Sequence, residues 1–194
     1  MRSVVAGMFL LIVSFFTLQG REVSGVVFEE TLSFNNHKLH LNGVGILKKS
    51  IFRVKVYANA LYLLQKDSNP PSIIMANEMM AVRMHILYRR ITHKQLIDGL
   101  RNGFNYSTGR NAEKLKKLQT RIDKFLSFFV GKPNKYDTAT FLYIPGQGTH
   151  ISINNTYKGY LPGLDFKKAL FGIWLGTNPA DKELKKGLLG EREQ

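Results

Sequence analysis

The stretch IFRVKVYANALYL, residues 51–63, decides the expected fold because its side chains alternate in character along most of its length. On one face lie mainly apolar or small residues: Phe52, Val54, Val56, Ala58, Ala60 and Tyr62. On the other face lie long hydrogen-bonding side chains: Arg53, Lys55, Tyr57 and Asn59. A period of two is typical of a β-strand that buries one face. The sequence therefore predicts a long strand with its apolar face in a core.

Shorter strands are predicted on both sides of this one. The strand-like segments are two within residues 31–42, around an Asn35-Asn36 turn, and then 81–89, 136–144, 150–153 and 157–161. The turn Pro145-Gly146-Gln147-Gly148 lies between 136–144 and 150–153, and Asn154-Asn155 precedes the last segment. Between the predicted strands at 81–89 and 136–144, Thr92 and Gln95 have the spacing of a capping box. That spacing predicts the start of a helix at Thr92.

Three more helices are expected further along the chain. Residues 111–129 carry an apolar stripe at helical spacing, and lysines cover the rest of that segment. Asp165 is placed to cap a helix that contains Trp174, and a last helix is expected to begin near Pro179. Because helices do not alternate regularly with strands, the pattern predicts an α+β fold. Its sheet should be largely antiparallel, with helices packed on one side.

The first twenty residues are typical of a signal peptide. Arg2 is followed by an uncharged run over residues 4–18, which is shorter than the roughly 20 residues that cross a bilayer. We therefore expect residues 1–20 to be removed, leaving residues 21–194 as one domain that works in the periplasm or is secreted. Leu18 marks cleavage after Gly20 only weakly, so an uncleaved anchor is the alternative.

The composition limits the chemistry. The chain has 194 residues and a formal net charge of +14, which favours anionic partners. It has no cysteine, which excludes disulfides, thiolate metal sites and a cysteine nucleophile. Its five histidines show no metal-ligand spacing, so we expect no metal and no cofactor. Export argues against nucleic acid as a partner, and the lysine-rich face of residues 111–129 predicts only a weak electrostatic contact with membranes.

A series of short motifs runs from residue 41 to residue 190. They are LNGVG at 41–45, FRVKVY at 52–57, ALYL at 60–63, YIPGQGT at 143–149, GLDF at 163–166, IWLG at 173–176, PAD at 179–181 and LKKGLLG at 184–190. In this order and spacing the motifs resemble the bacterial chalcone-isomerase-like domain. The resemblance implies an open-faced β-sandwich, with a long antiparallel sheet, helices layered on one face and a ligand cleft between them.

The resemblance also carries expectations about activity. The plant enzymes of the family close a chalcone into a flavanone and use an arginine to stabilise the developing enolate. Related non-catalytic members bind fatty acids through an arginine and a tyrosine. Leu47 stands where the enzymes have their arginine, and Tyr57 stands where they have a threonine. We therefore expect this chain to lack catalytic residues.

The residues expected to bind a ligand are those of the polar face of the 51–63 strand: Arg53, Tyr57, Lys55 and Asn59. Two cations and a phenol suit a carboxylate, because hydrogen bonds to a charged group are strong. The alternative is a solvated face whose long stems lie over the sheet. On the neighbouring strand, Arg83, His85 and Arg89 are expected at the surface rather than in a site.

The predicted function is a non-catalytic binding protein for a small amphipathic anion such as a fatty acid. One alternative is an intramolecular lyase or isomerase that acts on an enone-like, chalcone-type substrate. The other alternative is an interaction protein that uses its basic surface. The isomerase would need Tyr57 for turnover, whereas the basic surface would act only at low salt.

Overall fold

The computed structural model describes residues 20–34, 36–49 and 53–191. Its strands are β1 (Gly20–Val23), β2 (Val26–Glu29), β3 (Thr31–Phe34), β4 (His37–Lys49), β5 (Val54–Leu63), β6 (Met80–Ile86), β7 (Thr138–Ile144), β8 (Gly148–Ile153) and β9 (Thr156–Leu161). Its helices are α1 (Pro70–Met75), α2 (His93–Ser107), α3 (Ala112–Ser127), α4 (Leu164–Leu175) and α5 (Lys182–Leu188). Residues 1–19 lie outside the described part, so the signal peptide stays a prediction.

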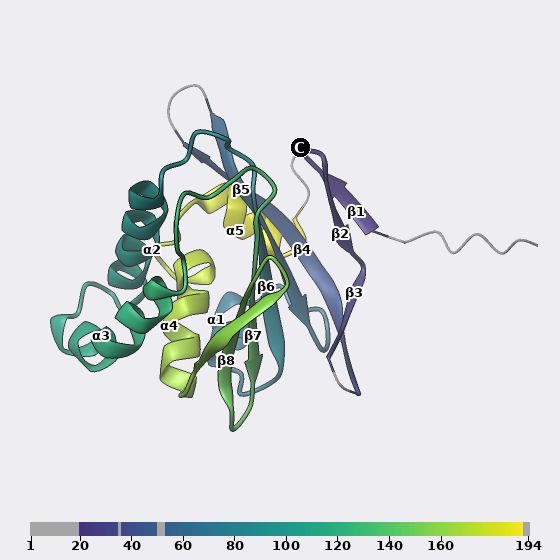
Figure 1. Ribbon diagram of the computed structural model, residues 1–194. Helices are drawn as coiled ribbons and strands as arrows, with labels where there is room; N and C mark the ends of the chain where they lie inside the picture. The colour runs from purple at the N-terminus through teal and green to yellow at the C-terminus, as the bar shows by residue number, and fades with distance from the viewer. Residues whose placement is uncertain (1–19, 35, 50–52, 192–194) are drawn as a thin grey trace, which may run out of the picture.

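Seven strands form one antiparallel sheet in which the spatial order, β3 to β9, is also the order along the chain. Figure 1 shows α2, α3 and α4 on one side of this sheet and the β1–β2 hairpin on the other. The predicted α+β class is thereby confirmed, as is the open-faced sandwich with helices layered on one face. Within the described residues, none of the helices is long and apolar enough to cross a membrane.

The larger core lies between the sheet and the helices, and aromatic rings dominate it. Phe104 of α2 lies 5.6 Å from Phe125 of α3 and 5.7 Å from Phe166 of α4, measured between ring centroids. On the sheet side, Phe141 of β7 stacks on Trp174 of α4 at 5.8 Å. All five side chains are fully buried. Truncating one such ring costs about 3–5 kcal/mol in a well-packed core, so this cluster fixes the helices on the sheet.

A short hairpin covers part of the opposite face of the sheet. The β1–β2 hairpin places Phe28 edge-on against His85 of β6, and Glu29 forms an ion pair with Arg83 at 2.9 Å. Ala58, Ala60 and Tyr62 of β5 are buried beneath this layer. Arg83 and His85 are therefore half-buried rather than freely exposed. The sequence patterns predict neither this hairpin nor helix α1.

The helix starts agree with the sequence in part. The Thr92 capping box is confirmed, because the Gln95 backbone N–H donates to Thr92 Oγ1 and the Thr92 backbone N–H donates to Gln95 Oε1. The expected start near Pro179 is wrong, since α5 begins after Asp181, whose carboxylate accepts from the backbone N–H of Leu184 at 2.8 Å.

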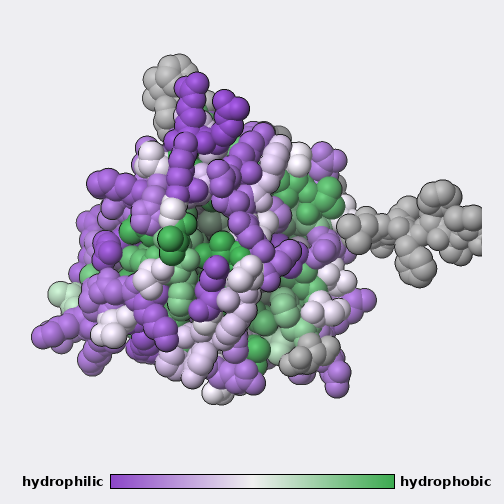
Figure 2. All heavy atoms as spheres, viewed as in Figure 1, coloured by the Kyte–Doolittle hydropathy of each residue, from purple (hydrophilic) through white to green (hydrophobic). Residues whose placement is uncertain are grey.

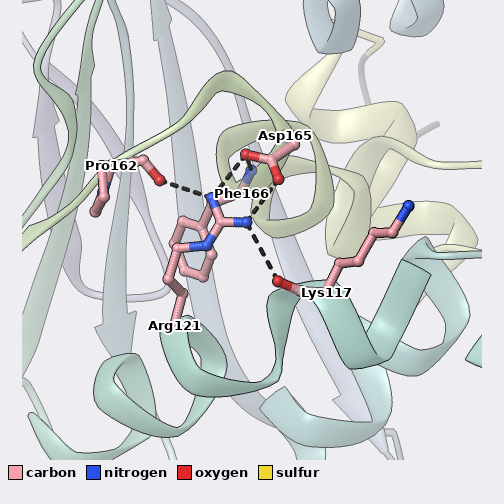
Figure 3. Close-up of polar contacts among 5 residues, drawn as sticks. All are labelled: Lys117, Arg121, Pro162, Asp165 and Phe166. Carbon is pink, nitrogen blue, oxygen red and sulfur yellow. Dashed lines mark hydrogen bonds and ion pairs between the residues drawn. The ribbon is translucent and has the colours of Figure 1, made fainter. Parts of the chain in front are cut away.

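Asp165 does not cap α4 as predicted, because it lies inside the first turn and Gly163 occupies the capping position. Figure 3 shows what Asp165 does instead: both of its carboxylate oxygens accept hydrogen bonds from the Arg121 guanidinium of α3, at 2.7 and 2.6 Å. Arg121 also donates to the Pro162 carbonyl at 2.9 Å. These hydrogen bonds lower the pKa of Asp165 below its usual range. The pair therefore joins α3 to the turn in which α4 begins.

Candidate ligand cleft

A cleft of about 770 Å³ lies between α2 and the ends of β4 and β5. Figure 2 shows a mainly hydrophilic face in whose middle hydrophobic side chains gather beside α2. Most of the cleft wall is apolar, but several hydrogen-bonding side chains also line it. The apolar side chains that line it are Leu47, Val54, Val56, Ile91, Leu96, Leu100, Ile173, Pro179 and Ala180. The polar ones are Lys49, Tyr57, Tyr88, Gln95, Asp98, Asn102 and Tyr106.

A β-bulge in β5 shapes the floor of the cleft. Leu47 of β4 pairs with Tyr57, but the next residue, Lys48, pairs with Lys55, so Val56 has no partner in the ladder. A bulge of this kind bends the strand and re-aims side chains. As a result Val54, Val56 and Tyr57 all line the same cleft, although strict alternation would separate Tyr57 from the two valines.

Tyr57 is the hydrogen-bonding group of the cleft floor. Its side chain is only 7% exposed, and its hydroxyl oxygen accepts a hydrogen bond from Trp174 Nε1 at 3.1 Å. Burial raises the pKa of Tyr57 well above its usual value, so the phenol is neutral throughout the physiological range. Because the indole occupies a lone pair and not the phenol proton, Tyr57 keeps an O–H with which it can donate to a ligand.

Asn59 lies behind Tyr57, away from the cleft. It is fully buried, and the amide orientation that satisfies both of its polar atoms has its oxygen accept from the same Trp174 Nε1, at 3.1 Å. Trp174 thus has two acceptors within reach. Asn59 therefore shares the Trp174 indole with Tyr57, and the structure does not place it among the lining residues.

Lys49 supplies the positive charge of the cleft. Among the described residues it is the one lysine or arginine in the lining, and its side chain is exposed at the mouth. It lies two residues beyond Leu47 on β4, so both side chains point to the same face of the sheet. Sequence reasoning missed Lys49. The signal that could have found it is its two-residue spacing from Leu47, which puts both side chains on one face of a strand.

The wall opposite the sheet is one side of α2. Its polar members Gln95, Asn102 and Tyr106 are exposed, and Asp98 is held in an ion pair with Lys94. Gly99 lies among them, and a β-carbon at this position would have nothing within 4 Å. Helix α2 thus lines the cleft with polar side chains around Gly99, next to which there is open space.

The structure does not bring the four predicted site residues together. Tyr57 lies in the cleft and Asn59 lies behind it, as described above. The Lys55 ammonium donates to Ser24 Oγ at 3.0 Å, and Ser24 belongs to the turn of the hairpin on the opposite face of the sheet. Arg53 is exposed in the turn before β5, with a φ of 50°, and neither it nor Lys55 is among the described residues that line the cleft.

An antiparallel sheet, a helical layer on one face and a mainly apolar cleft between them define an open-faced α+β sandwich. Within that class the chain belongs to the chalcone isomerase-like family, whose model matches residues 20–190. A fatty-acid binding protein from Arabidopsis thaliana has a similar structure, with a TM-score of 0.70 and 17% sequence identity. The similarity covers 86% of this chain and 92% of the Arabidopsis chain. No curated protein sequence matches the chain.

Proposed function

We propose that the protein binds a small amphipathic anion, with a fatty acid as the best candidate, in the cleft between α2 and the β4–β5 edge. The observation that carries this proposal is Tyr57, a neutral phenol that lines the cleft among Leu47, Val54 and Val56 and whose hydroxyl oxygen accepts from Trp174 Nε1. A donor in that position suits an oxygen of a ligand head group. The fatty-acid binding protein of similar fold supports an acyl ligand for this cleft.

The size and lining of the cleft suit an alkyl chain. A volume of about 770 Å³ lies within the range of about 300–1,000 Å³ that is typical of small-molecule sites. Each methylene moved from water into such an apolar site contributes about 0.8 kcal/mol. The walls formed by Leu47, Ile91 and Ile173 would therefore supply most of the affinity, and the polar groups would fix the orientation.

Lys49 and Tyr57 together would hold the carboxylate. Lys49 lies about 6.6 Å along β4 from Leu47, which is the cross-strand partner of Tyr57. A flexible lysine stem can cover most of that separation, so one carboxylate can accept from both the ammonium and the phenol. A hydrogen bond to a charged group contributes about 1.5–3 kcal/mol.

The same floor supports a binder over an isomerase. Leu47 lines the cleft at the position where the family's enzymes have an arginine, so among the described residues no fixed cation lies on the floor beside Tyr57 to stabilise an enolate. A panel of chalcones and related enones should therefore show no turnover above the buffer rate. Turnover that disappears in a Tyr57→Phe variant would favour the isomerase instead.

We also propose that the domain works outside the cytosol after removal of residues 1–20. The charged start and short apolar run of that segment support this proposal. Fractionation of the producing cells, with the mature amino terminus determined by mass spectrometry, would test it. A protein retained in the cytosol with residues 1–20 intact would contradict it.

Ligand titration tests the binding proposal. Delipidated protein should bind saturated fatty acids, as measured by calorimetry, and Tyr57→Phe should weaken that binding about tenfold or more. Asn59 remains as an acceptor for Trp174 in that variant, so the fold should survive. Lys49→Gln should also weaken binding, whereas Lys55→Gln, which removes the same charge on the opposite face, should not. Absence of binding, or equal losses for Lys49→Gln and Lys55→Gln, would refute the proposal.

A further inference from the structure

A second hollow of about 300 Å³ lies beside the cleft. Its floor is formed by Met84 and Ile86 of β6 and by Ala139 of β7, and its roof by the end of α3 and the loop that follows. Leu96 of α2 lines both hollows. No other described residue lines both hollows.

The two floors are continuous across the sheet. Tyr57, on the floor of the cleft, is the direct cross-strand partner of Ile86, on the floor of the second hollow. Paired residues of neighbouring antiparallel strands point to the same face, with β-carbons about 5 Å apart. The two hollows therefore lie next to each other on the helix-side face of the sheet, and Leu96 of the helix layer belongs to both linings.

Local structure holds Leu96 firmly in place. Its side chain is only 7% exposed, and it follows directly on the Thr92 capping box in the first turns of α2. His93 of the same turn contacts the Phe129 carbonyl through Nε2 at 2.8 Å, which ties α2 to the roof of the second hollow. Leu96 is thus a fixed partition and not a surface side chain that swings freely.

We propose that Leu96 determines the length of the alkyl chain that the cleft accepts, by separating the cleft, as a first chamber, from the second hollow, as a second chamber. This inference rests on the proposed function, because it concerns the apolar part of the same ligand. Ligands short enough to end at Leu96 bury their whole chain. Each further methylene finds no apolar wall and adds no affinity.

Affinities for saturated fatty acids of increasing length test the proposal. In the wild-type protein, affinity should rise about fourfold per methylene and then stop rising at a defined length. Leu96→Ala should move that limit to longer chains by several carbons, because it opens the second chamber. Leu100→Ala removes the same volume from the same helix but lines the first chamber alone, so it should move the limit by one or two carbons at most.

A second substitution separates an opened partition from general loosening of the core. Ala139→Leu fills the second chamber, so it should restore the wild-type limit when it is combined with Leu96→Ala. On its own it should leave the wild-type limit unchanged. A limit that Ala139→Leu shortens by itself would show that ligands already pass Leu96, and would overturn the proposal. So would a limit that is the same in Leu96→Ala and in the wild type.

Two safeguards keep these outcomes distinct. Should Leu96→Ala fail to fold, Leu96→Val makes a smaller opening and should move the limit in the same direction. If the wild-type protein binds no fatty acid at any length, the proposed function fails. If it binds and only the dependence on Leu96 is absent, this inference alone fails.

Discussion

At the scale of single residues, Gly99 and Gly103 show how α2 keeps the cleft open. A β-carbon at Gly99 would lie in open space, whereas one at Gly103 would lie 2.6 Å from Ile173 Cγ2. A glycine inside a helix costs about 0.5–1 kcal/mol relative to alanine. Close packing on α4 explains Gly103, but nothing packed against Gly99 explains its presence. Room for a ligand would explain it.

Substitutions at the two glycines should therefore have opposite effects on stability. We expect Gly99→Ala to raise the free energy of unfolding by about 0.5–1 kcal/mol, since helix propensity is its main effect. Gly103→Ala should lower it, because Ile173 must shift. Gly99→Leu should fill the cleft and weaken ligand binding while leaving the protein folded. Urea unfolding and ligand titration of the three variants measure this, and a Gly99→Leu variant with unchanged affinity would place the ligand elsewhere.

Tyr57 and Lys55 show what residue-level prediction could and could not see. The family pattern pointed to Tyr57, and the structure places it on the cleft floor. Lys55 was predicted on the same face, but the unpaired residue Val56 lies between the two and sends Lys55 to Ser24. Nothing in an alternating sequence marks such a bulge, because it arises from how β4 and β5 pair.

At the scale of elements, helix α1 is hard to predict from the sequence because two successive prolines, Pro70 and Pro71, are typical of a loop. The prolines are in fact at the start of the helix, where their missing N–H groups cost nothing. The other end is held by Lys167 of α4, whose fully buried ammonium donates to the carbonyls of Ile73, Ile74 and Ala76. A partner almost a hundred residues away cannot be read from local sequence.

The β1–β2 hairpin makes the protein sensitive to acid through His85. Burial, followed by the charge of Arg83, lowers the pKa of His85 from 6.5 to about 4, while Glu29 acts weakly in the opposite direction. The unfolded chain therefore binds a proton near pH 6.5 and the folded protein binds one only near pH 4. Between these values the unfolded state carries more protons, so stability falls as the pH falls from about 6.5 to 4.

Replacing the imidazole should remove this part of the acid sensitivity. We expect the urea midpoint of a His85→Gln variant to fall less than that of the wild type between pH 7 and pH 4.5, each compared with its own value at pH 7. The ring contact with Phe28 is lost at both pH values, so it cancels in that comparison. Equal falls in the two proteins would show that other groups govern the acid response.

At the scale of the whole molecule, the sequence predicted the layers more securely than the contents of the cleft. The strand-rich first third, the two central helices and the last hairpins follow from periodicity and turn residues, and the structure has all of them. The cleft depends instead on how β4, β5, α2 and α4 meet, with further side chains from the connections before α2 and after α4. Lys49, Gly99 and Leu96 acquire their places only through that assembly.

The positive charge of the whole molecule favours contact with anionic membranes. The formal net charge is +14, and exposed lysines of α3, among them Lys116 and Lys117, form part of the surplus. The apolar stripe of α3 is buried in the core at Leu118, Ile122 and Phe125, so it is not free to insert into a bilayer. Any attraction to an anionic membrane should therefore be electrostatic, at about 1 kcal/mol for each basic residue close to the surface.

Vesicle sedimentation measures that attraction. The protein should bind vesicles rich in phosphatidylserine at low salt, should release them as the ionic strength approaches physiological values, and should not bind neutral vesicles. Reversing Lys116 and Lys117 to glutamate should weaken binding more than reversing Lys38 and Lys158, which are exposed on β4 and β9 and change the net charge equally. Equal losses would mean that net charge alone guides the contact. Binding that persists at high salt would mean that an apolar segment enters the bilayer, which the buried stripe of α3 does not allow.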